Sequence, residues 1–132
     1  YPSNVMKERF QLQFLLKTSP RVLESKLSTP SGLSEWFADD VNAREDHYTF
    51  TWNGMDEEAQ LIHHKQNQKI RFQWIIDQEE NLDTYFELSH EVDGLTGMVS
   101  LTITDFAEPD EKEDATRMWE QQIQNLRRLI GA

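Results

Sequence analysis

The middle of the chain, from about residue 41 to residue 106, alternates apolar and polar side chains, which is the pattern of half-buried β-strands. Asn53-Gly54 is the strongest turn signal in this region, because both residues tolerate positive φ in a two-residue hairpin loop. A loop of that length also sets the register of the strands on either side of it. The pairs that it predicts are Trp52 with Met55, Phe50 with Glu57 and Tyr48 with Ala59.

The alternation places the apolar side chains of successive strands on one face of the predicted sheet. In the hairpin this face carries Tyr48, Phe50, Trp52, Met55, Ala59 and Leu61. The later strands add Ile70, Phe72, Trp74 and Ile76, then Phe86 and Leu88, then Val99, Leu101 and Ile103. A sheet with one apolar and one polar face is antiparallel and covered on one side only.

The segment before this region predicts one more strand and two short helices. Residues 7–19 alternate Phe10, Leu12 and Phe14 with polar residues, as a strand does. Ser19-Pro20 and Thr29-Pro30 then each place an N-cap residue before a proline at the first helical position.

After Pro109 the spacing of apolar residues changes to that of a helix. A helix of ~20 residues is ~30 Å long, enough to cross the whole sheet. Acidic residues at its start and Arg127 and Arg128 near its end favour the helix dipole, and Gly131 is a suitable stop. The apolar residues at helical spacing are Ala115, Met118, Trp119, Ile123, Leu126 and Ile130.

Composition limits the classes of protein to which the chain can belong. It has 132 residues, no cysteine and a formal net charge of −11, and the length suits a single domain over residues 1–132. The negative charge argues against nucleic acid and anionic membranes as partners, and it is compatible with a protein partner that has a basic surface. The lack of cysteine excludes thiolate catalysis and cysteine-ligated metals. No apolar run approaches the ~20 residues of a membrane span, so we expect a cytoplasmic protein.

A strand, two short helices, about six antiparallel strands and a long terminal helix follow one another in this chain. The segment after the first strand contains Pro30, Leu33 and the pair Trp36-Phe37, and the last helix contains Trp119. This order and these residues resemble the helix-grip fold of the START and birch-pollen-allergen (SRPBCC) superfamily. The nearest likeness is to bacterial START-like proteins related to the activator of heat-shock-chaperone ATPase.

The resemblance implies an α+β fold in which a curved sheet of about seven strands wraps around the C-terminal helix. It also implies that Trp36 and Phe37 insert between sheet and helix, and that a ligand cavity lies there. Burial of two aromatic side chains contributes roughly 3–6 kcal/mol, enough to hold a short helical segment in place. The candidate pocket residues are Trp36, Phe37, Trp52, Leu61, His63, Phe72, Trp74, Phe86, His90, Trp119 and Ile123.

Three ionisable residues, Glu57, His63 and His90, fall on the predicted apolar face, where they are candidates for polar groups that orient a ligand. We expect no cofactor and no metal site. His63 and His64 are neighbours in a strand and therefore point to opposite faces. His63 and His90 flank Ile70 and lie ~10 Å apart, too far to bind one metal ion.

The pattern favours a non-enzymatic protein that binds a small hydrophobic or amphipathic ligand between sheet and helix. No catalytic residue is predicted, because no nucleophile elbow, dinucleotide-binding loop or phosphate-binding loop occurs. One alternative, implied by the resemblance, is a protein-interaction module of the chaperone-ATPase-activator type. Another is an enzyme of cyclase or hydratase type, as some superfamily members are, which needs two or more of Glu57, His63 and His90 to converge on one void.

Overall fold

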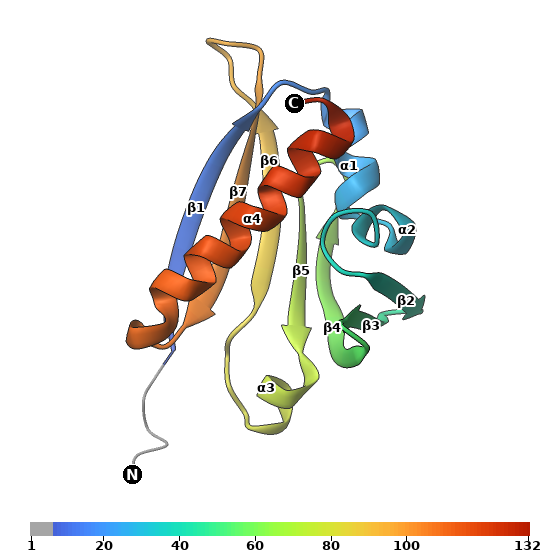
Figure 1. Cartoon of the computed structure of the whole chain (residues 1–132), viewed down its shortest axis with the longest axis vertical. Helices are drawn as coiled ribbons and strands as arrows, with labels where there is room; N and C mark the ends of the chain where they lie inside the picture. The colour runs from blue at the N-terminus through green and yellow to red at the C-terminus, as the bar shows by residue number, and fades with distance from the viewer. Residues whose placement is uncertain (1–6) are drawn as a thin grey trace.

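The structure is a computed structural model that describes residues 7–132 (Figure 1). The strands are β1 (Glu8–Leu16), β2 (Asp40–Arg44), β3 (His47–Trp52), β4 (Met55–Lys65), β5 (Lys69–Trp74), β6 (Phe86–Val92) and β7 (Val99–Ala107). The helices are α1 (Pro20–Leu27), α2 (Pro30–Leu33), α3 (Ile75–Glu79) and α4 (Lys112–Ile130), and a 3₁₀ turn spans Pro109–Glu111. The predicted α+β helix-grip fold, with two short helices after the first strand, is confirmed.

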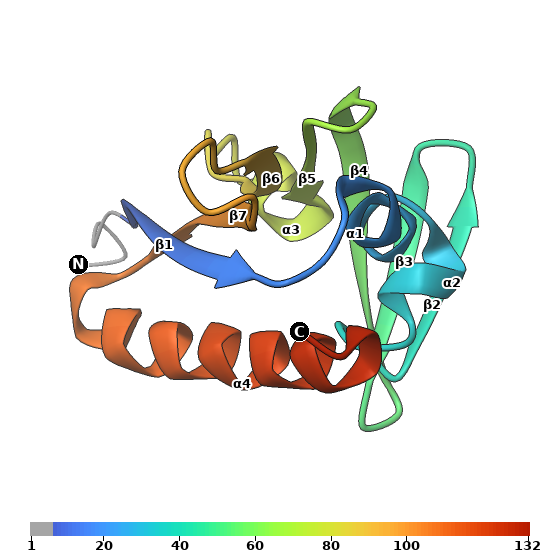
Figure 2. The same cartoon turned by 90° about the horizontal axis from the view of Figure 1, so that it is seen from above.

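All seven strands belong to one antiparallel sheet, in the order β1-β7-β6-β5-β4-β3-β2. Strands β2 to β7 therefore pair with their neighbours in sequence, and within residues 7–132 the β1–β7 pair is the one that joins strands distant in sequence. Figure 2 shows the sheet curving over one side of α4, which lies across it. The residues between the inner face of the sheet and α4 form the core.

The predicted hairpin register is confirmed at all three pairs. Two residues expected on the apolar face are instead exposed. Met55 is 72 % exposed, because the hairpin turn before it projects past α4 (Figure 2). Ile76 is 66 % exposed, because β5 ends at Trp74 and the chain turns into α3, which ends the strand alternation.

Helix α4 packs one face against the sheet and leaves the other in solvent. The buried face consists of Trp119, Ile123 and Leu126. Gly131 follows the helix with φ of 73°, a left-handed conformation that glycine adopts without steric penalty. The predicted stop is thus confirmed.

The two short helices begin as predicted, each with a side-chain cap. Ser19 Oγ accepts a hydrogen bond from the backbone of Val22 at 3.2 Å, and Thr29 Oγ1 accepts one from Gly32 at 2.9 Å. A Cβ on Gly32 would lie 2.1 Å from the carbonyl oxygen of Ser25, so α1 and α2 can approach this closely only with glycine there.

Trp36 and Phe37 follow α2 in a tight turn, and each is 4 % exposed. The indole of Trp36 donates to the carbonyl of Lys26 in α1 at 2.8 Å, which ties the turn to the first helix. Phe37 extends toward the sheet. The predicted insertion between sheet and helix is confirmed for Phe37, whose ring contacts both Phe50 of the sheet and Trp119 of α4, whereas Trp36 is buried beside α1.

Candidate functional site

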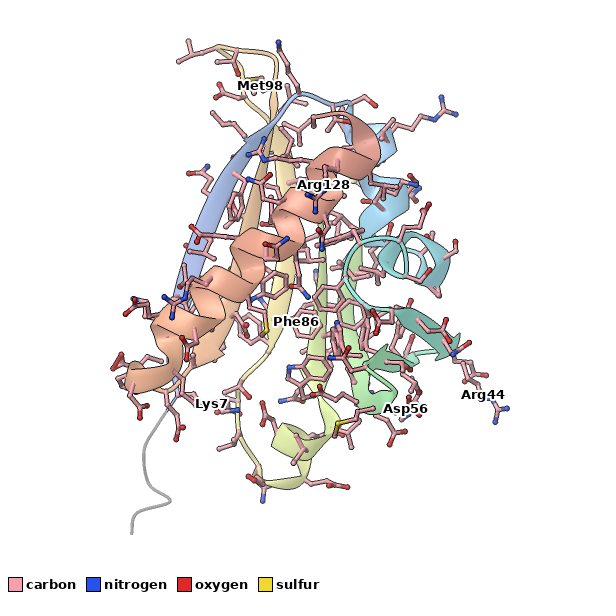
Figure 3. The ribbon with its side chains drawn as sticks, viewed as in Figure 1. Lys7, Arg44, Asp56, Phe86, Met98 and Arg128 are labelled. Carbon is pink, nitrogen blue, oxygen red and sulfur yellow. The ribbon has the colours of Figure 1, made fainter. Side chains whose placement is uncertain are left out.

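Phe37 lies at the point where the sheet, the α2 turn and α4 meet. Its ring centre is 5.3 Å from those of Phe50 and Trp52 in β3. It is 5.6 Å from Phe86 in β6 and 5.5 Å from Trp119 in α4, and it stacks on both. Phe86 itself lies near the middle of the molecule (Figure 3). One ring thus connects three parts of the fold that are distant in sequence.

A cavity of about 450 Å³, here called the sheet–helix pocket, opens beside this aromatic cluster. The sheet and the α2 turn form one wall, and α4 forms the other. The carbonyl of Phe37 accepts two hydrogen bonds here: the indole of Trp52 donates to it at 2.8 Å within the first wall, and the amide of Gln122 donates to it at 2.9 Å and joins the two walls. The lining residues are Phe37, Trp52, Asn53, Glu57, Trp74, Phe86, Asp105, Met118, Trp119 and Gln122.

Five of the eleven predicted pocket residues line this cavity: Phe37, Trp52, Trp74, Phe86 and Trp119. Four others lie in the core or against it and do not line the cavity. Trp36, Phe72 and Ile123 are buried, and Leu61 is partly buried against the core. The remaining two, His63 and His90, lie elsewhere.

The expected position of His63 on the apolar face is wrong. A β-bulge between Leu61 and His63 shifts the register, so that His63 pairs with Arg71 and His64 pairs with Ile70. One additional residue in a strand moves every later side chain to the opposite face. His64, and not His63, therefore lies on the face that α1 covers.

His90 is buried, as an apolar-face residue should be, but it points to α1 and not into the sheet–helix pocket. Its Nε2 lies 3.1 Å from Oε1 of Glu24, and Nε2 of His64 lies 3.3 Å from Oε2 of the same carboxylate. Ser28 Oγ also donates to Oε2, at 2.8 Å. One carboxylate of α1 thus joins the helix to β4 and β6.

The environment of Glu24 favours its charged form. Burial raises the pKa of Glu24, but hydrogen bonds from His90, Ser28, the Asn67 backbone and His64 outweigh burial, and the pKa lies below its usual value. Nδ1 of His90 is buried without a hydrogen-bond partner among the described residues. The cluster holds α1 against the sheet and lies apart from the sheet–helix pocket.

Sequence reasoning missed Asp105, the less exposed of the two carboxylates that line the sheet–helix pocket. Asp105 lies in β7 in phase with Leu101 and Ile103, so the alternation itself places it on the apolar face. Its Oδ2 accepts a hydrogen bond from the indole of Trp119 at 2.8 Å. Burial raises the pKa of Asp105 above its ordinary value, and hydrogen bonds from Trp119 and the Phe106 backbone, together with the charge of Lys7, offset part of this rise.

A second hollow of about 330 Å³ adjoins the sheet–helix pocket and shares Trp74, Asp105 and Met118 with it. It is predominantly acidic. Lys7 pairs with the buried Asp77 at 3.2 Å, and Thr84 donates to the same carboxylate at 2.6 Å. The other acidic residues around it are Glu108, Glu111 and Asp114.

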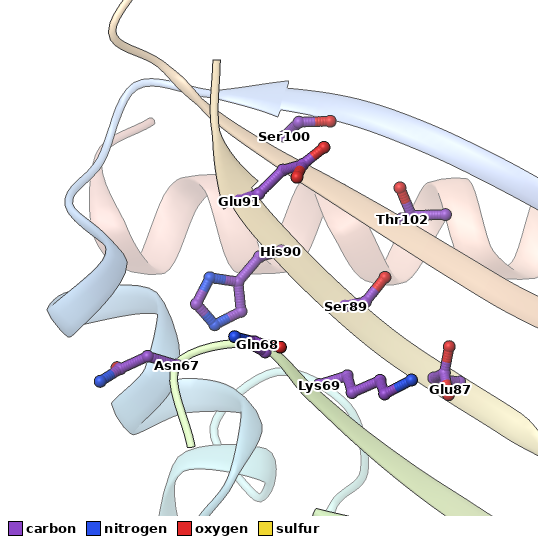
Figure 4. Close-up of a pocket in the computed structure, with 9 residues that line it drawn as sticks. All are labelled: Asn67, Gln68, Lys69, Glu87, Ser89, His90, Glu91, Ser100 and Thr102. Atoms are coloured by element: carbon purple, nitrogen blue, oxygen red, sulfur yellow. The ribbon is translucent and has the colours of Figure 1, made fainter. Parts of the chain in front are cut away.

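A third hollow, of about 580 Å³, lies near the turn between β4 and β5 and along β6 and β7 (Figure 4). Figure 4 shows the ring of His90 beside the turn that carries Asn67 and Gln68. The hollow has no apolar side chain in its lining, so it offers no surface for a hydrophobic ligand. The lining residues are Asn67, Gln68, Lys69, Glu87, Ser89, His90, Glu91, Ser100 and Thr102.

Within residues 7–132, no group of three or more potential metal ligands comes together. No helix of this range has the length and apolar character needed to cross a membrane.

A curved antiparallel sheet around a terminal helix, with an aromatic pocket between them, defines the helix-grip class of proteins. A family model for the START-like superfamily domain matches residues 4–132, so the chain belongs to this superfamily. No curated protein gives a significant match.

Solved structures extend this comparison. The chain is 36 % identical to BfR322 from Bacteroides fragilis, with a TM-score of 0.66, and the match covers 94 % of this chain and 91 % of that one. It shares 16 % identity with a subunit of the Aha1 dimer from Colwellia psychrerythraea, with coverages of 93 % and 96 % and a TM-score of 0.77. DynU16, from the dynemicin biosynthetic locus, is 12 % identical over 94 % of this chain and 47 % of its own, with a TM-score of 0.74. The latter two similarities concern the fold alone.

Proposed function

We propose that this protein binds a small hydrophobic or amphipathic ligand in the sheet–helix pocket and does not transform it. The observation that carries the proposal is the pocket itself, a cavity of about 450 Å³ with five aromatic side chains in its walls. Pockets for small ligands range from about 300 to 1,000 Å³ and combine apolar walls with a few polar groups. Glu57, Asp105, Asn53 and Gln122 are the polar groups here.

Binding is favoured over catalysis by the positions of the ionisable side chains. Of the three candidates Glu57, His63 and His90, only Glu57 lines the sheet–helix pocket. The convergence that a cyclase or hydratase mechanism requires is therefore not met by these three residues. His90 instead contacts Glu24 of α1.

The test is a ligand screen by thermal shift and native mass spectrometry, with lipids, sterols and aromatic polyketides. A ligand present at 100 times its Kd stabilises the folded state by about 2.7 kcal/mol, which thermal shift detects. The expected result is a mass adduct accompanied by a higher melting temperature.

Two exposed methionines supply a matched pair of variants for this screen. Met118 borders the sheet–helix pocket and is 62 % exposed, so Met118→Trp narrows the opening with little disturbance of the core. Met55 is similarly exposed but lies outside the pocket, so Met55→Trp is the control. A true pocket ligand stabilises the wild type and Met55→Trp and loses affinity for Met118→Trp. If no compound in the screen binds, the proposal fails.

A second candidate function is a protein-interaction module that binds a partner with a basic surface. The net charge of −11 and the structural similarity to a subunit of the Aha1 dimer favour it. Association steered by charge weakens as salt screens the surface. Pull-down experiments at low and high salt test it: a partner retained equally at both contradicts this candidate.

A further inference from the structure

We propose that the sheet–helix pocket selects an organic cation, an ammonium group with apolar substituents, over neutral and anionic ligands of the same shape. This inference rests on the proposed binding function and specifies the ligand class. Three features of the pocket carry it: the arrangement of its aromatic rings, the sign of its charges and the accepting oxygens of its carboxylates.

The aromatic side chains form a contiguous wall. Successive ring centres around the circuit Phe37, Trp52, Trp74, Phe86 and Trp119 lie 5.0 to 6.2 Å apart, and Trp119 returns to Phe37 at 5.5 Å. Trp52 and Trp74 are only partly buried, so their surfaces are the ones open to a ligand. The faces of aromatic rings, tryptophan above all, attract cations and give aromatic cages their affinity for quaternary ammonium groups.

The charges at the pocket have one sign. Glu57 and Asp105 contribute carboxylates, and the lining contains no lysine, arginine or histidine among the described residues. Glu57 makes no ion pair within the described part of the chain. In the adjoining hollow the cation of Lys7 is already paired with Asp77 at 3.2 Å. A ligand carboxylate or phosphate would therefore meet negative groups with no lining cation to compensate it.

Three of the hydrogen-bond donors of the lining are used by the protein. The indoles of Trp52 and Trp119 and the amide of Gln122 donate to Phe37 O, Asp105 and Phe37 O respectively. In the described part of the chain, the indole of Trp74, the amide of Asn53 and the second N–H of Gln122 retain donors without a partner. The charged groups of the lining are carboxylates, whose oxygens only accept when ionised and so favour a ligand that donates or carries positive charge.

The experiment compares three probes with the same phenylbutyl body: phenylbutyl trimethylammonium, phenylbutanol and 5-phenylpentanoate. Binding is followed by the indole N–H signals of the four tryptophans in ¹⁵N-labelled protein. Trp52, Trp74 and Trp119 line the pocket, whereas Trp36 donates to Lys26 O at 2.8 Å outside it and serves as an internal control. The expected result is that the ammonium probe binds on the order of tenfold more tightly than the alcohol, equivalent to about 1.4 kcal/mol, and that the carboxylate binds most weakly.

Neighbouring glutamates provide the matched variants. Glu57 faces the pocket, while Glu58, the next residue in β4, points to the opposite face and lies 2.6 Å from His47. Glu57→Gln is expected to weaken binding of the ammonium probe about fivefold and to keep the affinity for the alcohol within about twofold of the wild-type value. Asp105→Asn, which keeps an acceptor for Trp119, is expected to behave in the same way. Glu58→Gln, with the same change in net charge, is expected to alter neither affinity.

The possible failures are distinguishable. Equal affinity for the three probes, or tightest binding of the carboxylate, overturns the inference and leaves the proposed binding function standing. An equal loss of ammonium affinity in Glu57→Gln and Glu58→Gln also overturns it, because the attraction would then come from net charge alone. If no probe shifts the signals of the three pocket tryptophans, the inference is overturned and the proposed function is weakened with it.

Discussion

Replacement of Phe37 by alanine tests whether the turn after α2 is held in place by its aromatic side chain. Phe37 is 4 % exposed and packs against Phe50, Trp52, Phe86 and Trp119 at ring-centre distances of 5.3 to 5.6 Å. Truncation of a buried phenylalanine to alanine destabilises a protein by about 3–5 kcal/mol. Because small domains unfold at a free energy of only about 5–15 kcal/mol, the loss is a large fraction of the total.

The same loss can be expressed as a melting temperature. The unfolding entropy of about 2.1 cal/mol/K per residue amounts to about 0.28 kcal/mol/K for 132 residues, so the melting temperature falls by roughly 11–18 °C. Trp36 remains buried beside the new cavity and still donates to Lys26 O, so we expect a folded variant. Urea and thermal unfolding followed by circular dichroism provide the measurement.

Met55→Ala is the control for Phe37→Ala, because Met55 is largely exposed at the hairpin. Exposed positions of this kind change stability by no more than about 0.5 kcal/mol. If Phe37→Ala destabilises the protein by less than about 1 kcal/mol, the conclusion that the Phe37 ring holds the turn after α2 in place is refuted.

Two predictions concern carboxylates whose pKa values shift in opposite directions. Burial raises the pKa of Asp105 from 3.8, so the contribution of this residue to stability is greatest below that pH and declines as pH rises through the folded-state pKa. Asp105→Asn should remove this decline in urea unfolding curves measured at several pH values. An unchanged pH profile of stability would contradict the prediction. Hydrogen bonds outweigh the effect of burial on Glu24 and lower its pKa from 4.5, so its contribution is complete above that pH and is lost as pH falls through the folded-state pKa. Glu24→Gln should therefore reduce stability at neutral pH by about 1–3 kcal/mol, with the difference shrinking in acid, and equal stability of the two proteins at neutral pH would contradict the role of the cluster.

Much of the sheet could be predicted because strand alternation is a local property of the sequence. Asn53-Gly54 determined the β3–β4 register through turn geometry, and the three predicted pairs are those observed. The change to helical spacing after Pro109 predicted α4, and Gly131 predicted its end. The insertion of Phe37 between sheet and helix, by contrast, was implied by the resemblance to the helix-grip fold and not by the local pattern.

The candidate site was harder to predict, because its composition depends on contacts between distant segments. A single β-bulge after Leu61 places His64, and not His63, on the face of the sheet that alternation predicts for His63. No turn signal in the sequence marks this bulge. The carboxylate that contacts both His64 and His90 belongs to Glu24 of α1, which lies 40 residues before the first histidine and 66 before the second. Asp105 could have been found, because it alternates in β7 on the same face as Leu101 and Ile103. That alternation predicts the face of the sheet but not the cavity that the side chain lines.

By itself, the order of residues determined which segments become strands and helices, which side of each is apolar and where the chain turns, since these follow from backbone preferences and from spacings of two and 3.6 residues. The tertiary structure decided which of those apolar residues fill the core and which surround an opening. Phe72 and Trp74 are separated by one residue in β5 and point to the same side, yet the first is fully buried and the second lines the sheet–helix pocket. The reason is geometric: the curvature of the sheet over α4 leaves room at one position and none at the other, and curvature results from all seven strands together.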